Sequence, residues 1–397
     1  MLRARSRPAT TFTTASVSLV AVCAAAGVPA PLYVVYQQTY GVSTVALTGA
    51  FAIYILPLLA ALLCCGSLSD HLGRRRVAVP ALLVGAGACL VLATVDSAAP
   101  LIVGRAAQGL SVGLALSALG AFVVDLAPPS RPGLAGAVTS GAPPGGIAIG
   151  ALASGAAVQL APERAPVLSF VVTAALLTLA AVAVGVLPET VTQRKPGALR
   201  SLRPEVAVPA AARAVFPVVC VLVAATYVLG GFTQALAPSL AVSVLGRTDL
   251  FGGALTVAVF HLAGPVAGLT ASRWRTAPAL AGGAAVLVAG TGGFIVAIAV
   301  GSFAVYLGAA VVAGAGFGVA FAAAMRILLE RSPAGVHAAT LAAVYLFCYL
   351  AAAVSSLLAG AAVEVWGLAP VASVLCGLVI VMVAAGATGS VLRTRAT

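Results

Sequence analysis

The sequence predicts an all-α polytopic membrane protein, in which twelve transmembrane helices form two pseudo-symmetric six-helix bundles. Hydrophobic residues make up 62% of the 397-residue chain and charged residues only 8%, and the mean hydropathy is +1.15. Soluble domains carry about 25% charged residues, so this composition requires lipid as the solvent. A series of long apolar segments and an internal repeat predict how many helices there are and how they are grouped.

Twelve segments are long enough to cross a bilayer, because a spanning helix needs about 20 apolar residues. Each segment is continuously apolar, which excludes a transmembrane β-barrel, since barrel strands alternate in hydrophobicity. In chain order the segments cover approximately residues 13–36, 43–66, 77–96, 99–122, 133–158, 166–187, 214–238, 250–271, 277–300, 302–325, 337–361 and 368–391.

The positions of the basic residues predict the orientation of the chain. With the N-terminus in the cytoplasm, 18 of the 21 lysines and arginines fall in cytoplasmic segments, all except Arg105, Arg164 and Arg247. The positive-inside rule then places both termini in the cytoplasm. The net charge of +12 is therefore a topology signal, and we expect no nucleic-acid partner.

The first segment imitates a signal peptide, because three arginines between residues 3 and 7 precede an apolar run of small residues. The apolar run continues through "VPAPLYVVY" at residues 28–36. Cleavage would remove one span and reverse the charge bias of the loops. We therefore expect an uncleaved first helix.

One polar, basic stretch divides the twelve segments into six and six. We take residues 189–213 as a cytoplasmic linker between an N-terminal bundle (1–188) and a C-terminal bundle (214–397). A repeat supports this division, because four residues of the fourth segment recur in the tenth at a constant offset of 205 positions. The pairs are Gly109 and Gly314, Gly113 and Gly318, Asp125 and Glu330, and Pro128 and Pro333. Parallel repeats of six helices are typical of secondary transporters with a binding site between the halves.

Two motifs resemble those of the major facilitator superfamily, and the likeness extends over the whole chain. "GSLSDHLGRRR" at Gly66–Arg76 resembles the signature between the second and third helices of that family. "LIVGRAAQGLSVG" at Leu101–Gly113 resembles its fourth-helix motif. The resemblance implies a twelve-helix transporter that works by alternating access.

The first motif is the candidate conformational latch, formed by Gly66, Asp70, Gly73, Arg74 and Arg75. Gly66 allows close approach to a neighbouring helix, Asp70 can pair with an arginine, and Gly73 permits a tight turn. The resemblance implies that the latch stabilises the outward-open state and breaks during transport. The alternative is a turn whose arginines only anchor the loop at the cytoplasmic face. The corresponding loop of the second half has Ser272 in place of the acid, so we expect a latch in the first half only.

Two side chains within the spans are candidates for coupling, Arg105 and His261. An arginine inside a bilayer is costly unless it is paired or hydrated, and the resemblance links this fourth-helix arginine to proton coupling in antiporters. His261 is the embedded side chain whose ordinary pKa lies nearest neutrality. Arg105 could instead extend to the outer surface, and His261 could be a structural residue of a helix interface. No carboxylate lies in the middle of a predicted span, which argues against a simple carboxylate relay.

Polar and aromatic residues of several spans are candidates for lining a substrate cavity, although each could equally serve in helix packing. They are Tyr33, Tyr36, Gln37, Tyr54, Gln108, Tyr227, Gln234, Tyr306, Tyr345 and Tyr349. Pro29 and Pro31 should interrupt the first helix near its outer end. Pro143, Gly145 and Gly146 should kink and tightly pack the fifth helix, whose sequence partly resembles the antiporter motif of the family.

These observations favour proton-linked export of a small lipophilic or weakly charged organic compound across a bacterial inner membrane. The alternatives are an uptake symporter or facilitator, with Arg105 binding an anionic group, and a sensor or scaffold that transports nothing. We expect no enzyme activity and no metal or other cofactor, because the sequence has no Gly-x4-Gly-Lys and no HExxH motif. The expected partners are a small-molecule substrate and the lipid bilayer, and we expect a monomer whose energy comes from the proton gradient.

Overall fold

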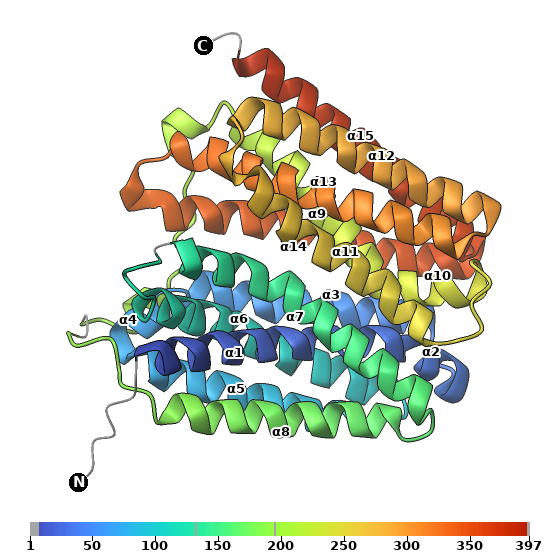
Figure 1. Ribbon diagram of the computed structural model, residues 1–397, viewed down its shortest axis with the longest axis horizontal. Coiled ribbons are helices and arrows are strands. Elements are labelled where there is room, and N and C mark those ends of the chain that lie inside the picture. The colour runs from blue at the N-terminus through green and yellow to red at the C-terminus, as the bar shows by residue number, and fades with distance from the viewer. Residues whose placement is uncertain (1–7, 132, 194–195, 395–397) are drawn as a thin grey trace.

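The computed structural model describes residues 8–131, 133–193 and 196–394, and these residues form helices joined by short loops (Figure 1). Twelve of the described segments are long and apolar enough to span a membrane, which confirms the predicted fold class. The first half contains α1 (Pro8–Gly27), α2 (Pro29–Tyr40), α3 (Thr44–Cys65), α4 (Leu68–Leu72), α5 (Arg74–Leu92), α6 (Ala98–Asp125), α7 (Gly133–Leu160) and α8 (Ala165–Gly185). The second half contains α9 (Phe216–Ala235), α10 (Ala237–Ser243), α11 (Phe251–Thr270), α12 (Thr276–Val300), α13 (Phe303–Glu330), α14 (His337–Trp366) and α15 (Leu368–Thr394).

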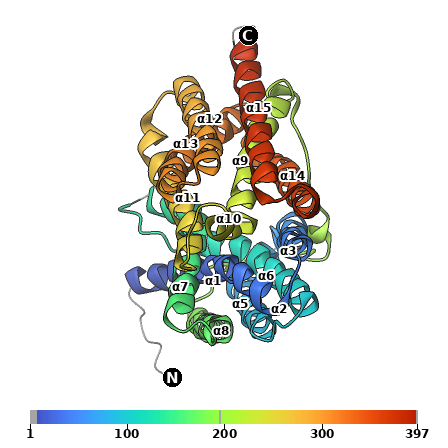
Figure 2. The same ribbon diagram turned by 90° about the vertical axis from the view of Figure 1, so that its right-hand side faces the viewer.

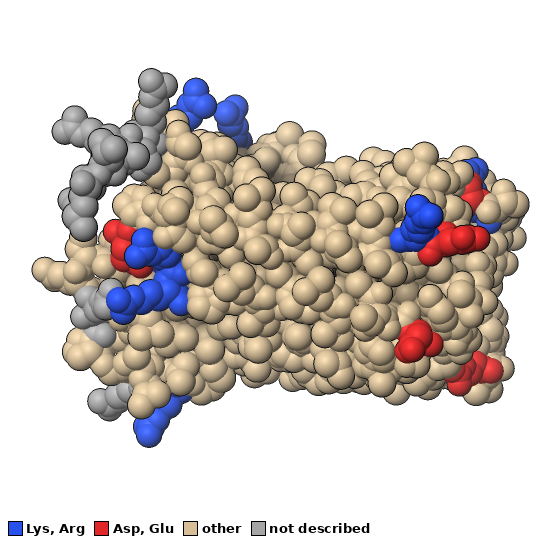
Figure 3. All heavy atoms as spheres, turned by 90° about the horizontal axis from the view of Figure 1, so that it is seen from below, with Lys and Arg blue, Asp and Glu red and all other residues tan. Residues whose placement is uncertain are grey.

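The helices of the two halves lie as two groups, one above the other in Figure 1 and again in the view along the helices in Figure 2. The short helix α4 lies at one end of the molecule, where α1 begins and α15 reaches its last turn. We name this the inner end, following the predicted orientation, and the end with α2 and α10 the outer end. On the face shown in Figure 3, charged side chains gather at the two ends and leave a band without charged side chains between them.

Prolines affect the first and fifth spans differently. The first span is interrupted at Val28, so that α1 ends at Gly27 and α2 begins with Pro29. The helix α7 instead continues through Pro143 and Pro144. Proline is tolerated inside a membrane helix where neighbouring groups satisfy the freed carbonyls.

The glycines of the internal repeat are sites of close backbone contact. A methyl group on Gly109 would overlap the carbonyl oxygen of Tyr54 in α3, and one on Gly318 would overlap that of Gly264 in α11. A Cβ at Gly113 would lie 2.6 Å from the Leu58 carbonyl oxygen. The pair α6 and α3 therefore packs in the same way as the pair α13 and α11. Small residues permit this approach, which supplies much of the attraction between helices in lipid.

The two halves meet at their outer ends. In one contact, Gly360 of α14 lies so close to Thr48 of α3 that a Cβ on the glycine would overlap the threonine hydroxyl. In the other, a Cβ on Gly155 of α7 would overlap Ala254 of α11. A hydrogen bond of 2.8 Å from the hydroxyl of Ser239 to Gln37 Oε1 joins α10 to α2. The outer ends are thus closed against each other.

The packing at Gly318 predicts a measurable loss of stability. We expect Gly318→Ala to destabilise the protein by about 1–3 kcal/mol, because the added methyl group forces two backbones apart. Gly308→Ala on the same helix is the matched control, since nothing lies within 4 Å of a Cβ at that position. The thermal midpoint of each purified variant in detergent measures the difference, and equal midpoints would contradict the packing described.

Candidate functional site

Gly73 lies at the turn between α4 and α5, in a conformation that requires glycine. Its φ is +107°, a value that residues other than glycine rarely adopt. A Cβ there would also lie 2.5 Å from Oε2 of Glu189. The glycine therefore brings the start of α5 against the chain that follows α8.

Arg74 forms the centre of an ionic network at the inner end. Its guanidinium makes ion pairs with Asp70 and with Asp125 at the end of α6, the latter at 3.0 Å from Nε to Oδ2. Its Nη1 also donates to the hydroxyl of Ser69 at 2.7 Å. The Arg74 side chain is only 14% exposed, so these bonds are shielded from full solvent screening. Three elements of the first half are joined here.

Glu189 completes this network from the segment after α8. Its carboxylate accepts hydrogen bonds from the backbone N–H groups of Arg74 at 2.8 Å and Arg75 at 3.2 Å. These groups belong to the first turn of α5, where a negative charge stabilises the helix dipole. Arg75 in turn donates from Nη1 to the carbonyl oxygens of Gly185 and Leu187, at 3.1 and 3.2 Å.

The structure thus adds Asp125 and Glu189 to the residues of the predicted latch. The sequence identifies Asp125 only as a member of the internal repeat and Glu189 only as the first residue of the linker. Sequence distance hides their role, because 115 positions separate Arg74 from Glu189. Gly66 differs from expectation in another way, since the nearest atom to a Cβ there is the carbonyl oxygen of Leu62, 2.7 Å away in its own helix.

The second half has a different contact at the corresponding loop. Arg326 of α13 donates to the carbonyl oxygens of Ser272 and Trp274, at 3.0 and 3.2 Å. Glu330, the repeat partner of Asp125, is exposed and makes no ion pair within the described part of the chain. The ionic network in the described structure therefore belongs to the first half, while the second half uses an arginine that binds backbone carbonyls.

Arg105 is buried inside the first bundle and is only 1% exposed. Its Nη1 donates to Gln108 Oε1 at 2.5 Å and to the carbonyl oxygen of Ala26 at 3.4 Å, and Gln108 donates to Ala25 of α1. The guanidinium lies 4.1 Å from the ring centroid of Tyr54. Its Nε has no hydrogen-bond partner among the described residues. The positive charge is thus held by a side-chain amide, one backbone carbonyl and an aromatic face, with no carboxylate partner among the described residues, and it does not extend to the surface.

His261 lies in the middle of α11 and is 8% exposed. Its Nδ1 is 2.8 Å from the carbonyl oxygen of Val257, so Nδ1 carries the hydrogen and donates it. No hydrogen bond to Nε2 is found among the described residues. Val257, one turn away, packs with Ala30 and with Ala151 of α7. The histidine therefore lies on a helix that contacts the other half, with one ring nitrogen free.

An aromatic cluster lies at the centre of the second half. The ring of Tyr227 in α9 lies 4.9 Å from that of Tyr349 and 6.4 Å from that of Tyr345, both in α14. The hydroxyls of Tyr227 and Tyr349 are hydrogen-bonded to each other. Phe321 of α13 lies 6.2 Å from Tyr227. Tyr349 also interacts electrostatically with Tyr54 of α3, the ring that lies against Arg105.

The predicted cavity residues therefore separate into groups. Tyr54, Gln108, Tyr227, Tyr345 and Tyr349 form or adjoin the central cluster described above. Tyr36 and Gln37 lie at the outer contact, where Gln37 also donates to Thr44 at 3.1 Å. Tyr33 instead lies near enough to Arg105 and Tyr54 to interact with both electrostatically. Gln234 is half-buried in α9.

Tyr306 lies elsewhere, against Phe294 of α12 at a centroid distance of 4.6 Å. Phe321 and its stacked neighbour Phe317 were missed, because phenylalanines in an apolar helix give no signal that separates them from ordinary packing.

Known proteins resemble this chain in family and fold. The family model described as Major Facilitator Superfamily matches residues 15–356. The solved structures that match include the crystal structure of the human organic anion transporter MFSD10 (TETRAN). It has 19% sequence identity and a TM-score of 0.67, over 96% of this chain and 100% of that chain. A search of curated proteins found no match. The structural likeness shows a shared fold.

The Glu189 contacts predict that this carboxylate stabilises the first half. We expect Glu189→Gln to lower stability by about 1–3 kcal/mol, because the N–H groups at the start of α5 lose a charged acceptor. Glu330→Gln is the control, since that exposed acid makes no ion pair within the described residues. Thermal midpoints in detergent at low ionic strength measure both variants. An equal effect of the two substitutions would show that the network does not hold α5 in place.

Proposed function

Because this chain belongs to the major facilitator superfamily, we propose that it exports a small lipophilic or weakly charged organic compound in exchange for protons. Family membership supports a secondary transporter that moves small molecules across a lipid bilayer. The observation that carries the more specific proposal is the aromatic cluster of the second half, whose Tyr349 interacts with Tyr54, the ring that lies against the buried Arg105. The cell membrane of a bacterium is the proposed location, with both termini in the cytoplasm and a monomer as the working unit.

The closed outer ends fit one state of an alternating-access cycle. Close glycine contacts and the Ser239–Gln37 hydrogen bond join the halves on the outer side. In this proposal the cycle breaks these contacts and exposes the central cluster to the outside. The ionic network of Arg74 joins elements of one half only, so it keeps α4, α5 and α6 together as that half moves.

The chemistry of the cluster supports a substrate with aromatic or apolar surface. Tyr227, Tyr345, Tyr349 and Phe321 offer ring faces and edges together with a few hydroxyls. Such groups bind apolar ligands with few polar contacts that fix their orientation. An export substrate that dissolves in the inner leaflet would meet this chemistry without a large loss of hydration.

A second candidate function is transport of an organic anion, in either direction. Arg105 favours it, because its positive charge has no carboxylate partner among the described residues. One of the solved structures that match is that of an organic anion transporter. In this alternative the anionic group of the substrate approaches Tyr54 and Arg105.

His261 and Arg105 would have different roles in coupling. The free Nε2 of His261 can accept a proton while Nδ1 stays bonded to Val257, so the residue can load and release a proton without losing its place. Arginine does not lose its proton in proteins. Arg105 would therefore act through its fixed charge, by disfavouring a second positive charge nearby.

Accumulation of a panel of fluorescent aromatic compounds in cells tests the proposed export. Cells with the gene should accumulate less of at least one compound than cells without it, and an uncoupler should remove the difference. In cells with His261→Gln we expect equal accumulation with and without the uncoupler. His337→Gln, a control at the start of α14, should keep the response to the uncoupler. Unchanged accumulation of every compound would refute export, and higher accumulation of anionic compounds would favour the second candidate.

Arg105 gives a second test. We expect Arg105→Gln to reduce the transport rate about tenfold, since hydrogen bonds to a charged group contribute about 1.5–3 kcal/mol and about 1.4 kcal/mol changes a rate tenfold. Arg164→Gln, on an outer loop, should keep the rate of the unchanged protein. Vesicle transport at matched protein levels measures both, and full activity of Arg105→Gln would leave the residue with a packing role.

A further inference from the structure

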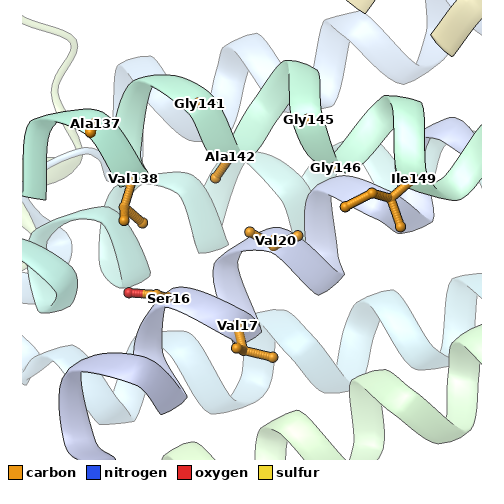
Figure 4. Close-up of a pocket in the computed structure, with 10 residues that line it drawn as sticks. All are labelled: Ser16, Val17, Val20, Ala137, Val138, Gly141, Ala142, Gly145, Gly146 and Ile149. Atoms are coloured by element: carbon orange, nitrogen blue, oxygen red, sulfur yellow. The ribbon is translucent and has the colours of Figure 1, made fainter. Parts of the chain in front are cut away.

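The helices α1 and α7 touch closely in their outer halves and separate toward the inner end. A Cβ at Gly146 would lie 2.5 Å from the Cβ of Cys23, and one at Gly150 would overlap the carbonyl oxygen of Ala24. Toward the inner end, a crevice of about 330 Å³ lies between the two helices (Figure 4). Its walls include Val17 and Val20 of α1, and Val138, Gly141, Gly145 and Ile149 of α7.

The residues that line this crevice favour an apolar ligand. The side chains that line it are aliphatic except for Ser16, whose hydroxyl already donates to the carbonyl oxygen of Phe12 at 2.8 Å. Nothing lies within 4 Å of a Cβ placed on Gly141 or Gly145. Val17 is 60% exposed and Ile149 is 52% exposed, so the crevice is open along its length. An aliphatic chain could lie in it without leaving a polar group unpaired.

The crevice starts on the inner side of the bilayer and extends to about its middle. Its lining residues on α7 run from Ala137 to Ile149, which is roughly 6–24 Å from the start of α7 at Gly133, at about 1.5 Å per residue. The hydrocarbon core of a bilayer is about 30 Å thick. In Figure 1 the helices α1, α7 and α8 lie on the side of the molecule that faces the viewer. We expect lipid chains around such a side face at this depth, because the chain spans the membrane.

A basic side chain lies on the loop just before α7. Arg131, two residues ahead of that helix, is exposed, and its guanidinium makes no hydrogen bond or ion pair with the described residues. From there to Val138 is about seven residues, or roughly 10 Å along the helix axis. A phospholipid whose phosphate lies at the membrane surface beside Arg131 could place an acyl chain in the crevice. Basic residues at the membrane surface also attract anionic headgroups electrostatically.

We propose that this crevice binds one acyl chain of an anionic phospholipid from the inner leaflet, with the phosphate against Arg131. The chain fills the space between the inner parts of α1 and α7 and keeps these helices apart. The binding site is independent of the transported substrate, and the proposal does not rest on the direction or coupling of transport.

Retention of phosphatidylglycerol by the purified full-length protein tests this site. Native mass spectrometry after detergent exchange should show one tightly held phosphatidylglycerol on the unchanged protein. We expect the double variant Gly141→Leu/Gly145→Leu to lose it, because the added side chains occupy the crevice. Gly308→Leu is the matched control, a glycine on an exposed helix face of α13 with equal free space, and it should retain the lipid.

The headgroup contact has its own variant. Arg131→Gln should weaken retention of phosphatidylglycerol about fivefold, the effect of removing one basic group near an anionic surface, and leave retention of phosphatidylcholine unchanged. A diazirine-labelled acyl chain of phosphatidylglycerol, photoactivated on the unchanged protein, should attach to peptides that contain residues 16–20 and 137–149. This measurement needs no variant to fold.

Three results would overturn the proposal. Retention of the lipid by the double variant would show that the crevice does not hold it. Attachment of the photoactivated chain only to other helices would show the same. Loss of transport in the double variant with unchanged lipid retention would identify the crevice as a path for the transported compound.

Discussion

Close contact between helix backbones is the constraint on which this structure depends. Lipid tails are as apolar as the helices, so burial alone gives no reason for one helix to prefer another over lipid. Attraction must come from the fit of surfaces, and Gly109, Gly113, Gly314 and Gly318 bring α6 and α13 against the carbonyls of α3 and α11. Glycines also join the halves at Gly155 and Gly360, where the close neighbours are the side chains of Ala254 and Thr48. The abundance of small residues is therefore a structural requirement of the fold.

Much of the architecture was predictable because the bilayer leaves few options. Continuous apolar segments predicted twelve spanning helices, and the structure and the family match confirm the fold class and the family. The constant offset of the repeat predicted that Gly109 and Gly314 occupy equivalent places, and both contact a neighbouring backbone. These features are local or periodic in the sequence, so they are visible before the chain is folded.

Partners far apart in the chain were harder to foresee. Glu189 contacts Arg74 only because α8 returns the chain to the start of α5, and no rule of sequence spacing predicts this contact. Tyr306 was grouped with the other tyrosines by residue type, but it faces Phe294, away from the central cluster. For an aromatic residue in an apolar helix, the sequence specifies the helix and leaves the direction of the side chain to tertiary packing.

The contact between Ser239 and Gln37 has a consequence for how the two ends respond to their surroundings. It is a hydrogen bond between uncharged groups, whereas the network around Arg74 consists of ion pairs. Dissolved salt screens charges but has little effect on a neutral hydrogen bond. The contacts that close the outer ends are thereby insensitive to the ionic strength of a variable environment. The partly buried ion pairs of Arg74, which keep only part of their dependence on salt, lie at the end predicted to face the buffered interior of the cell.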